Sequence, residues 1–433
     1  MGAIDLATAT WLAGTAGQKA IALAAEARGA APLDLAGAAG ALARTATHLS
    51  ATERASALAQ VELRERAAHK YEIDASNLLL TRDGLEQATR PAVSRARIAM
   101  LGLTAGSRVL DATAGLGFDA TAFISAGLQV TAVERDPVTA CLLRANLPTT
   151  AVLEADITDP RVLERATATL SSEDLVFFDP ARRSGTRSAD GARALPERDP
   201  ERWSPPWSFV QGLASRFRVC AKVAPGFPPW RVPEGWQAAW IATHDGPVEA
   251  CLLSWPALTT TRRACVISGA GVHQGDIGQE VVGQEVVRHD QVVHIDDDGL
   301  GASPVARAGT WLHEPAQVVT TADLIDALAR RTGLDRIGRD THWLTSDGPI
   351  DSPASTGLLA SYRVLDEVPT APKSLRAFLR SRGIKDVTIK SRGSRLDASG
   401  WRDRLRLPEG PSAILVFLEC AGTTHAYLVQ RHH

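Results

Sequence analysis

Residues 108–120, Arg-Val-Leu-Asp-Ala-Thr-Ala-Gly-Leu-Gly-Phe-Asp-Ala, constrain the fold of this chain more than any other stretch. The first four residues predict a short buried strand, residues 114–117 a tight turn of small residues, and residues 118–126 a helix. Glycines in such a turn let a ligand approach the backbone, and the unpaired N–H groups of the following helix point toward it. The stretch therefore predicts a ligand site between a strand and a helix.

Four apolar segments of this region each end in an acidic residue. In an open parallel α/β sheet, ligands bind at the carboxyl ends of the strands. A single acid at a strand end is more often a helix N-cap or a solvated turn residue, but four in this arrangement indicate a binding site. The segments are residues 108–111, 129–134, 152–156 and 175–179, and they end at Asp111, Glu134, Asp156 and Asp179.

Two ligands compete for the glycine turn. Gly115, Gly117 and Ala120 match the G-x-G-x-x-G/A dinucleotide fingerprint, and Glu134 follows at the distance expected of a ribose-binding acid. Asp111 argues against NAD, because a carboxylate at the end of the first strand would repel the pyrophosphate. S-adenosylmethionine (SAM) has no phosphate, and a nearby carboxylate favours its ammonium and sulfonium groups. The residues therefore favour SAM.

The pattern as a whole resembles the class I SAM-dependent methyltransferases. Residues 111–119 resemble the version of this motif in small-subunit ribosomal RNA guanine methyltransferases. The resemblance implies an α/β fold with a Rossmann-like, seven-stranded sheet and SAM as the cofactor, and Asp156 then suits the adenine amino group. The expected cofactor-binding residues in this region are Asp111, Ala112, Thr113, Gly115, Gly117, Glu134, Arg135 and Asp156.

Asp179-Pro180-Ala181-Arg182 lies where amine-directed methyltransferases carry an Asp/Asn-Pro-Pro-aromatic motif. An exocyclic amine on a base is a poor nucleophile, because its lone pair is delocalised into the ring. A carboxylate and a backbone carbonyl that accept its two N–H bonds would localise the lone pair and align it with the methyl group. We expect Asp179 to be this acceptor and Pro180 to fix the turn. Arg182 replaces the aromatic residue and could stack on a base or bind a phosphate, so both an exocyclic and a ring nitrogen stay open as targets.

The N-terminal residues 1–97 predict a helical domain, because they are rich in Ala, Leu, Glu and Arg with apolar residues at helical spacing. The last helix, expected near residues 84–101, leads directly into the first strand. Gln87 and Thr89 are therefore candidates to cover the methionine end of SAM. The alternative interpretation is that both are surface polar residues on a packed helix.

The remaining sequence predicts three further parts. We expect residues 98–256 to form the SAM domain, and an expected antiparallel last pair of strands adds to the resemblance, because such a pair is typical of the methyltransferase sheet. Residues 257–311 contain short alternating runs that predict a β-rich linker region. Residues 312–433 predict a small α+β domain, and this segment resembles the THUMP-like C-terminal domain of bacterial methyltransferases, which implies RNA binding.

Composition and charge limit the function classes. The net charge of −2 gives no global signal for nucleic-acid or membrane binding. The five cysteines are scattered, without a C-x-x-C pair or a Cys/His cluster, so we expect reduced thiols and no structural metal. Because no stretch has the length and apolarity of a membrane span or a signal peptide, we expect a cytoplasmic protein. The sequence sets no oligomeric state.

The C-terminal part holds one local charge signal. Between Lys373 and Arg406 there are eleven lysines and arginines but three acids, which gives this segment a charge of +8. A run of charges is commonly a solvated helix face, whereas a concentrated basic face is the footprint of a protein that binds a phosphate backbone. Both interpretations stay open, and the second makes RNA a candidate partner.

Together these features predict a SAM-dependent methyltransferase that acts on a base nitrogen in RNA. The alternatives are a methyltransferase for a protein or small molecule, and an RNA-binding module without turnover. A NAD-dependent oxidoreductase is a further alternative, which binding of NADH in place of SAM would indicate.

Overall fold

The chain forms two compact units. The first contains residues 1–223 and 252–256, and the second contains residues 224–251 and 257–433. The computed structural model describes residues 4–30, 35–71, 73–181, 197, 199–243, 246–255, 258, 260–268, 291–350, 357–391, 401, 404–405, 410–420 and 422–432.

Every described element before the first strand is a helix, as the N-terminal composition predicts. Apolar side chains from these helices share one buried core. None of the described helices is both long and apolar enough to cross a membrane. The helices are α1 (Leu6–Ala13), α2 (Thr15–Ala30), α3 (Leu35–Thr45), α4 (Ala51–Tyr71), α5 (Arg82–Gln87) and α6 (Pro91–Leu101).

The single helix predicted just before the first strand is wrong, because α5 and α6 are separated. Between them, Ala88 and Arg90 have extended backbone angles. Pro91 explains the break, since proline has no N–H to donate and disfavours helical geometry at the residue before it. The break leaves Thr89 between the two helices, where it is buried.

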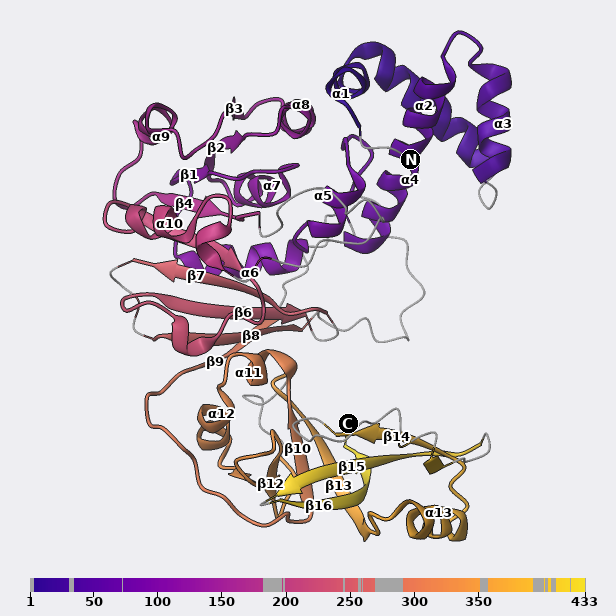
Figure 1. Ribbon diagram of the computed structural model, residues 1–433, viewed down its shortest axis with the longest axis vertical. Coiled ribbons are helices and arrows are strands. Elements are labelled where there is room, and N and C mark those ends of the chain that lie inside the picture. Colours follow the sequence, from indigo (N-terminus) through magenta and orange to yellow (C-terminus); the bar gives the residue numbers. More distant parts are fainter. Residues whose placement is uncertain are drawn as a thin grey trace, which may run out of the picture. The chain divides into compact units, whose positions relative to one another are not determined.

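Strands and helices alternate after α6 in the first unit (Figure 1). These elements are β1 (Arg108–Asp111), α7 (Phe118–Ser125), β2 (Gln129–Glu134), α8 (Pro137–Asn146), β3 (Ala151–Glu154), α9 (Pro160–Thr167), β4 (Leu175–Phe178), α10 (Trp207–Leu213), β5 (Arg218–Val223) and, later in the chain, β7 (Glu249–Ser254). The strand order is β3-β2-β1-β4-β5-β7, and β1 pairs in parallel with both β2 and β4. This arrangement confirms the predicted α/β fold.

The helical part packs directly on the glycine turn. Leu116 of the turn and Leu142 of α8 belong to the same buried core as the N-terminal helices. The amide nitrogen of Asn146 donates to the carbonyl oxygens of Leu79 and Leu116 at 3.1 and 3.0 Å. Its Oδ1 accepts the N–H of Leu79 at 2.7 Å. These bonds satisfy backbone groups that would otherwise be buried without partners, and they hold the helices against the turn.

The second unit begins with strands in the order β6-β8-β9. They are β6 (Gln237–Thr243), β8 (Arg262–Ser268) and β9 (Gln291–Asp296). β6 and β8 are parallel, and β8 and β9 are antiparallel. β8 and β9 lie in the segment predicted as a β-rich linker region, and Ala264, Cys265 and Val266 of β8 are buried. This segment is therefore part of a packed sheet.

A second sheet follows, with strand order β11-β12-β10-β13-β16-β15-β14. Its elements are β10 (Trp311–Pro315), α11 (Gln317–Thr321), α12 (Ile325–Thr332), β11 (Asp335–Arg336), β12 (Leu344–Ser346), β13 (Leu359–Val368), α13 (Pro372–Ser381), β14 (Asp386–Lys390), β15 (Ser412–Cys420) and β16 (Thr423–Arg431). Successive residues of β15 join different cores, Leu415 and Phe417 on one face and Val416 and Leu418 on the other. This alternation explains why β15 is apolar at consecutive positions.

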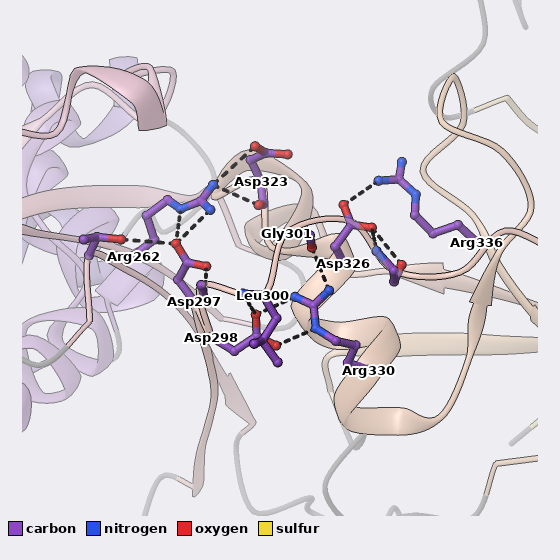
Figure 2. A network of polar contacts seen from close by, with 12 residues as sticks. Arg262, Asp297, Asp298, Leu300, Gly301, Asp323, Asp326, Arg330 and Arg336 are labelled. Carbon is purple, nitrogen blue, oxygen red and sulfur yellow. Dashed lines mark hydrogen bonds and ion pairs between the residues drawn. The ribbon is translucent and has the colours of Figure 1, made fainter.

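Ion pairs fix the segment after β9 to α12 (Figure 2). Arg262 of β8 donates from Nε to Asp297 Oδ2 at 2.9 Å. Arg330 of α12 donates from Nε to Asp298 Oδ2 at 2.7 Å, and from Nη1 to the carbonyl oxygen of Gly301 at 2.6 Å. The loop after β9 is therefore held by side chains from both a strand and a helix.

The contribution of this network to the stability of the protein can be tested at Asp326 of α12. Its carboxylate accepts from the N–H and hydroxyl of Ser303 at 2.8 and 2.7 Å, and from Arg336 and Arg339 at 3.0 and 2.9 Å. Asp326→Ala removes this partner from the buried Arg336, so we expect the free energy of unfolding to fall by about 2 kcal/mol in urea denaturation. The exposed Asp340, changed to Ala, is the control and should cost less than about 0.5 kcal/mol. Equal midpoints for the two variants would contradict the importance of the network.

Candidate active site

Side chains from neighbouring strands meet at the carboxyl end of the parallel sheet in the first unit. β1 ends at Asp111, Asp179 directly follows β4, and Lys222 is the last residue but one of β5. β4 pairs with β1 on one side and β5 on the other. The parallel register therefore brings two predicted acids and one unpredicted lysine to the same edge.

The ammonium group of Lys222 joins several polar side chains. Its Nζ donates to Asp179 Oδ2 at 2.6 Å, to Thr89 Oγ1 at 2.6 Å and to Asp119 Oδ2 at 3.3 Å. The Lys222 side chain is 9% exposed, whereas that of Asp179 is 30% exposed. Lys222 thus connects the break between α5 and α6 to the end of β4, and Asp179 is the member of this group that reaches solvent.

Asp119, in the first turn of α7, is the second carboxylate bound to Lys222. Its Oδ1 accepts the hydroxyl of Ser94 at 2.9 Å and forms an ion pair with Arg97, both on α6. Burial alone would raise the pKa of Asp119, but the charges of Arg97 and Lys222 lower it to about 2. Asp119 is therefore a carboxylate with two cationic partners.

Asp111 is the third carboxylate of the cluster, and it is 1% exposed. Its Oδ1 lies 3.4 Å from the backbone nitrogen of Thr113, and its Oδ2 has no hydrogen-bond partner among the described residues. Burial, followed by repulsion from Asp119, raises the pKa of Asp111 well above its usual value. Since burial of an unsatisfied carboxylate is unfavourable, the position favours a positively charged ligand.

The glycine turn borders Asp111 and leaves room for a ligand. Gly115 and Gly117 have φ angles of 54° and 90°, which favour glycine. A Cβ atom at Gly115 would meet no described heavy atom within 4 Å, whereas one at Gly117 would lie 2.7 Å from a methyl carbon of Leu143. Gly115 therefore faces open space, and Gly117 is required for the packing of the turn on α8.

Glu134, at the end of β2, contacts the same turn. Its Oε2 accepts the N–H of Gly115 at 3.0 Å, and its Oε1 accepts the N–H of Asp136 at 2.8 Å. Burial raises the pKa of Glu134, and the hydrogen bonds from Asp136 and Gly115 oppose this shift. Glu134 therefore contacts the backbone of the glycine turn at Gly115.

Two other predicted cofactor residues are exposed at the ends of β2 and β3. Arg135 donates from Nη1 to the hydroxyl of Ser204 at 2.5 Å. Asp156 lies two residues beyond β3 and accepts the hydroxyl and the N–H of Thr158 at 2.7 and 2.9 Å. These bonds lower the pKa of Asp156. Both side chains thus have local partners, and neither contacts the buried cluster through any bond described above.

The polar residues predicted to cover the methionine end of SAM separate in the structure. Gln87 is exposed on α5, whereas Thr89 is buried and accepts from Lys222. Ala112 is also buried, and its N–H donates to a carbonyl oxygen of β4 at 2.9 Å. The backbone of Ala112 therefore belongs to the sheet, and Thr89 belongs to the cluster.

The predicted catalytic turn is held by its backbone. The N–H of Asp179 donates to Thr113 Oγ1 at 2.6 Å, and Pro180 is buried. Ala181 exchanges two backbone hydrogen bonds with Ser204, at 2.9 and 3.1 Å. Arg182 lies outside the described residues. Thr113, predicted as a cofactor residue, thus fixes the start of this turn.

Two protein-family models match the chain. One, described as "Putative SAM-dependent methyltransferase", matches residues 44–189, and the other, described as "THUMP domain-like", matches residues 359–431. The chain is a SAM-dependent methyltransferase with a C-terminal THUMP-like domain. The first match includes the N-terminal part of this methyltransferase from α4 onward, the glycine turn and Asp179.

Two relatives and one solved structure are similar to this chain. An uncharacterized S-adenosylmethionine-dependent methyltransferase of Mycobacterium tuberculosis is 29% identical over 376 residues, which cover 83% of this chain and 92% of that protein. Ribosomal RNA small subunit methyltransferase J of Aeromonas hydrophila is 43% identical over 93 residues, which cover 18% of this chain and 37% of that protein. The crystal structure of a "putative methyltransferase" from Porphyromonas gingivalis W83 has a similar fold, with a TM-score of 0.65 and 19% identity over 88% of this chain and 91% of that one.

The methyltransferase site fits SAM at two points. SAM carries an ammonium and a sulfonium group, and Oδ2 of Asp111 is a buried oxygen that lacks a hydrogen-bond donor among the described residues. A cofactor must also approach the backbone closely, and Gly115 leaves the space in which a side chain would otherwise stand.

Several members of the cluster were not predicted from the sequence. Lys222 stands at a buried position of a largely apolar strand, Arg-Val-Cys-Ala-Lys-Val, and that placement is the signal that could have identified it. Arg97 is likewise fully buried on α6. A charged residue in such a position needs a partner of opposite charge. Lys222 and Arg97 therefore each indicated an acidic partner that the sequence analysis had not identified. The unpredicted members are Ser94, Arg97, Asp119 and Lys222.

The predicted basic segment of the THUMP-like domain is described in part. Arg382 pairs with Asp366 at 2.7 Å, and Lys390 pairs with Glu314 at 2.7 Å. Arg376 donates to a backbone carbonyl oxygen. The described bases that are exposed without these contacts are Lys373, Arg380, Lys385 and Arg404, and the bases outside the described residues are Arg392, Arg395, Arg402 and Arg406.

Alanine substitutions at Gly115 and Gly117 distinguish a glycine that leaves room for the ligand from a glycine that is needed for packing. Each substitution places a Cβ atom at a positive φ, which costs about 1 kcal/mol. Gly117→Ala also meets Leu143, so we expect the larger loss of thermal stability from this variant. Gly115→Ala should lose less stability but should weaken SAM binding at least about ten-fold in calorimetric titration, because the methyl group enters the ligand space. Wild-type SAM affinity in Gly115→Ala would contradict this placement of the cofactor.

Asp111→Asn should stabilise the protein without cofactor and weaken SAM binding. The pKa of Asp111 is raised in the folded state, so the wild type loses stability as the pH rises through that pKa. We expect the variant to be more stable by about 1 kcal/mol at neutral pH, and the difference to shrink as the pH falls toward 4. Thermal unfolding across this pH range measures the difference, and titration with SAM measures the loss of affinity. A variant that is less stable at neutral pH would show that Asp111 already has a favourable partner.

Proposed function

We propose that this methyltransferase methylates a nitrogen of an RNA base. The observation that carries the proposal is the 43% identity over 93 residues to ribosomal RNA small subunit methyltransferase J of Aeromonas hydrophila. The THUMP-like domain supports RNA as the acceptor. Its exposed Lys373, Arg380 and Lys385 offer positive charge to a phosphate backbone.

In this proposal the residues of the glycine turn and the strand ends would hold SAM. Asp111 would accept a hydrogen bond from the ammonium group of SAM, which would supply the donor that Oδ2 lacks among the described residues. Glu134 would accept from the ribose hydroxyls, and Asp156 would accept from the adenine amino group. Gly115 lets the cofactor approach the turn without a clash.

Asp179 and Pro180 act on the acceptor. A bound SAM would supply an electron-poor methyl group: the amine lone pair would form the N–C bond as the C–S bond breaks, S-adenosylhomocysteine would leave as the thioether, and one N–H proton would pass to water. Asp179 accepts one N–H bond of the amine and the carbonyl oxygen of Pro180 accepts the other, which localises the lone pair on nitrogen. Thr113 holds the backbone of Asp179, and the partial exposure of Asp179 allows a base to reach it. A base within a duplex must first leave the stack.

Transfer of radiolabelled methyl groups from SAM to total RNA tests this function. With RNA from cells that lack the gene, we expect the wild type to label RNA and Asp179→Ala to reduce the rate at least about 100-fold, because the amine loses its acceptor. The matched control is Asp174→Ala at the opposite end of β4, where Asp174 accepts the N–H of Arg108 at 2.8 Å. This control should lose stability but still label RNA.

The fraction that carries the label decides between the acceptor classes. Label in protein or in small molecules, with none in RNA, would contradict the proposed acceptor and favour the alternatives from the sequence. Equal rates for wild type and Asp179→Ala would leave RNA as the acceptor but remove Asp179 from the mechanism.

A further inference from the structure

The proposed reaction depends on how the carboxylate of Asp179 is oriented, and Lys222 contacts that carboxylate. Nζ of Lys222 lies 2.6 Å from Oδ2 of Asp179. Oδ1 of Asp179 has no hydrogen-bond partner among the described residues. We propose that Lys222 is a positioning residue, which holds Oδ2 so that Oδ1 is presented to the acceptor amine. This inference rests on the proposed function of Asp179.

Lys222 acts through Asp179 and does not contact the acceptor. A lysine ammonium has three N–H bonds, and Nζ of Lys222 has three acceptors, on Thr89, Asp119 and Asp179. Its side chain is 9% exposed, so an RNA base has little access to it. With its donors used and its charge paired, Lys222 affects the reaction by means of the groups that it binds.

Lys222 is one of several partners of the Asp119 carboxylate, whereas the Asp179 carboxylate relies on Lys222 more strongly. Asp119 also pairs with Arg97 and accepts the hydroxyl of Ser94 at 2.9 Å, and its distance to Lys222 is 3.3 Å. For the carboxylate of Asp179, Lys222 is the only hydrogen-bond donor among the described residues. Removal of Lys222 therefore leaves Asp119 compensated and leaves Asp179 without a partner.

A fixed orientation of the Asp179 carboxylate favours alignment of the acceptor amine. The terminal torsion of an aspartate is broad, so an unheld carboxylate samples orientations that point neither oxygen at the amine. A charge-assisted hydrogen bond of 2.6 Å is among the stronger contacts in proteins and restricts this rotation before the acceptor binds. Alignment lost by about 1 Å can reduce a rate about 100-fold.

A double-mutant cycle between Lys222→Met and Asp179→Ala tests the proposal. Methionine keeps an unbranched apolar stem but has neither the charge nor the donors. We expect Lys222→Met to lower kcat about 10- to 100-fold, because Asp179 is no longer oriented. The Kd for SAM should not rise, since the change removes a cation from beside a cationic cofactor. In the Asp179→Ala background, the same change should lower kcat less than about two-fold.

Arg97→Met is the matched control, because it removes a cation that pairs with Asp119 in the same cluster. Its effect on kcat should be the same factor in the wild type and in Asp179→Ala. The same background-independent factor for Lys222→Met would overturn the proposal, and so would a parallel loss of SAM affinity and kcat. Lys222→Gln keeps an N–H donor and should restore part of kcat relative to Lys222→Met. If Asp179→Ala has no measurable turnover, the comparison of Lys222→Gln with Lys222→Met tests the proposal instead of the cycle. Equal losses of kcat in Lys222→Gln and Lys222→Met would also overturn the proposal.

The cycle is measured on whichever fraction the wild type labels. Label outside RNA would contradict the proposed acceptor while the cycle still tests Lys222. Independent effects of the two substitutions on transfer to RNA would contradict the role of Lys222 alone. Absence of label in every fraction would contradict both.

Discussion

A group of three carboxylates and two cations, buried except for the partly exposed Asp179, determines the chemistry of the site. Asp119 and Asp179 have cationic partners, whereas Asp111 retains an oxygen with no donor among the described residues. In a poorly solvated site, a carboxylate that is not fully compensated attracts a cationic ligand strongly. Binding of SAM, which the family assignment requires, would supply the missing positive charge. Electrostatic balance and cofactor binding are therefore two aspects of the same arrangement.

The N-terminal helices are part of this arrangement. Thr89 comes from the break between α5 and α6, and Ser94 and Arg97 come from α6 itself. Without them, Asp119 would be a buried acid whose remaining cationic contact is Lys222 at 3.3 Å. The proline that interrupts the helix thus matters for the site, because a continuous helix would place Thr89 differently. The family match from residue 44 is consistent with this dependence, since it begins within the helical part.

The local parts of the fold and site were predictable, and the distant pairings were not. β1 and β2 have the expected bounds, and the glycine turn between β1 and α7 follows directly from residues 108–120. Lys222, however, lies 103 residues from Asp119 and 133 from Thr89. Hydrophobic periodicity describes neighbours within one element, so it contains no information on such pairs. The same limit explains why β8 and β9 were interpreted as a separate β-rich region, since pairing with β6 is a tertiary property.

The basic segment shows a related limit of counting charges along a sequence. Its charge of +8 counts every base between Lys373 and Arg406 against the acids of the same segment. The acids that pair with Arg382 and Lys390 are Asp366 and Glu314, which lie before the segment and were not counted. An arginine that already pairs with a carboxylate must break that contact to bind a phosphate, which reduces its contribution to RNA affinity. Recognition of RNA by this domain would therefore depend on the position of its exposed bases more than on their number.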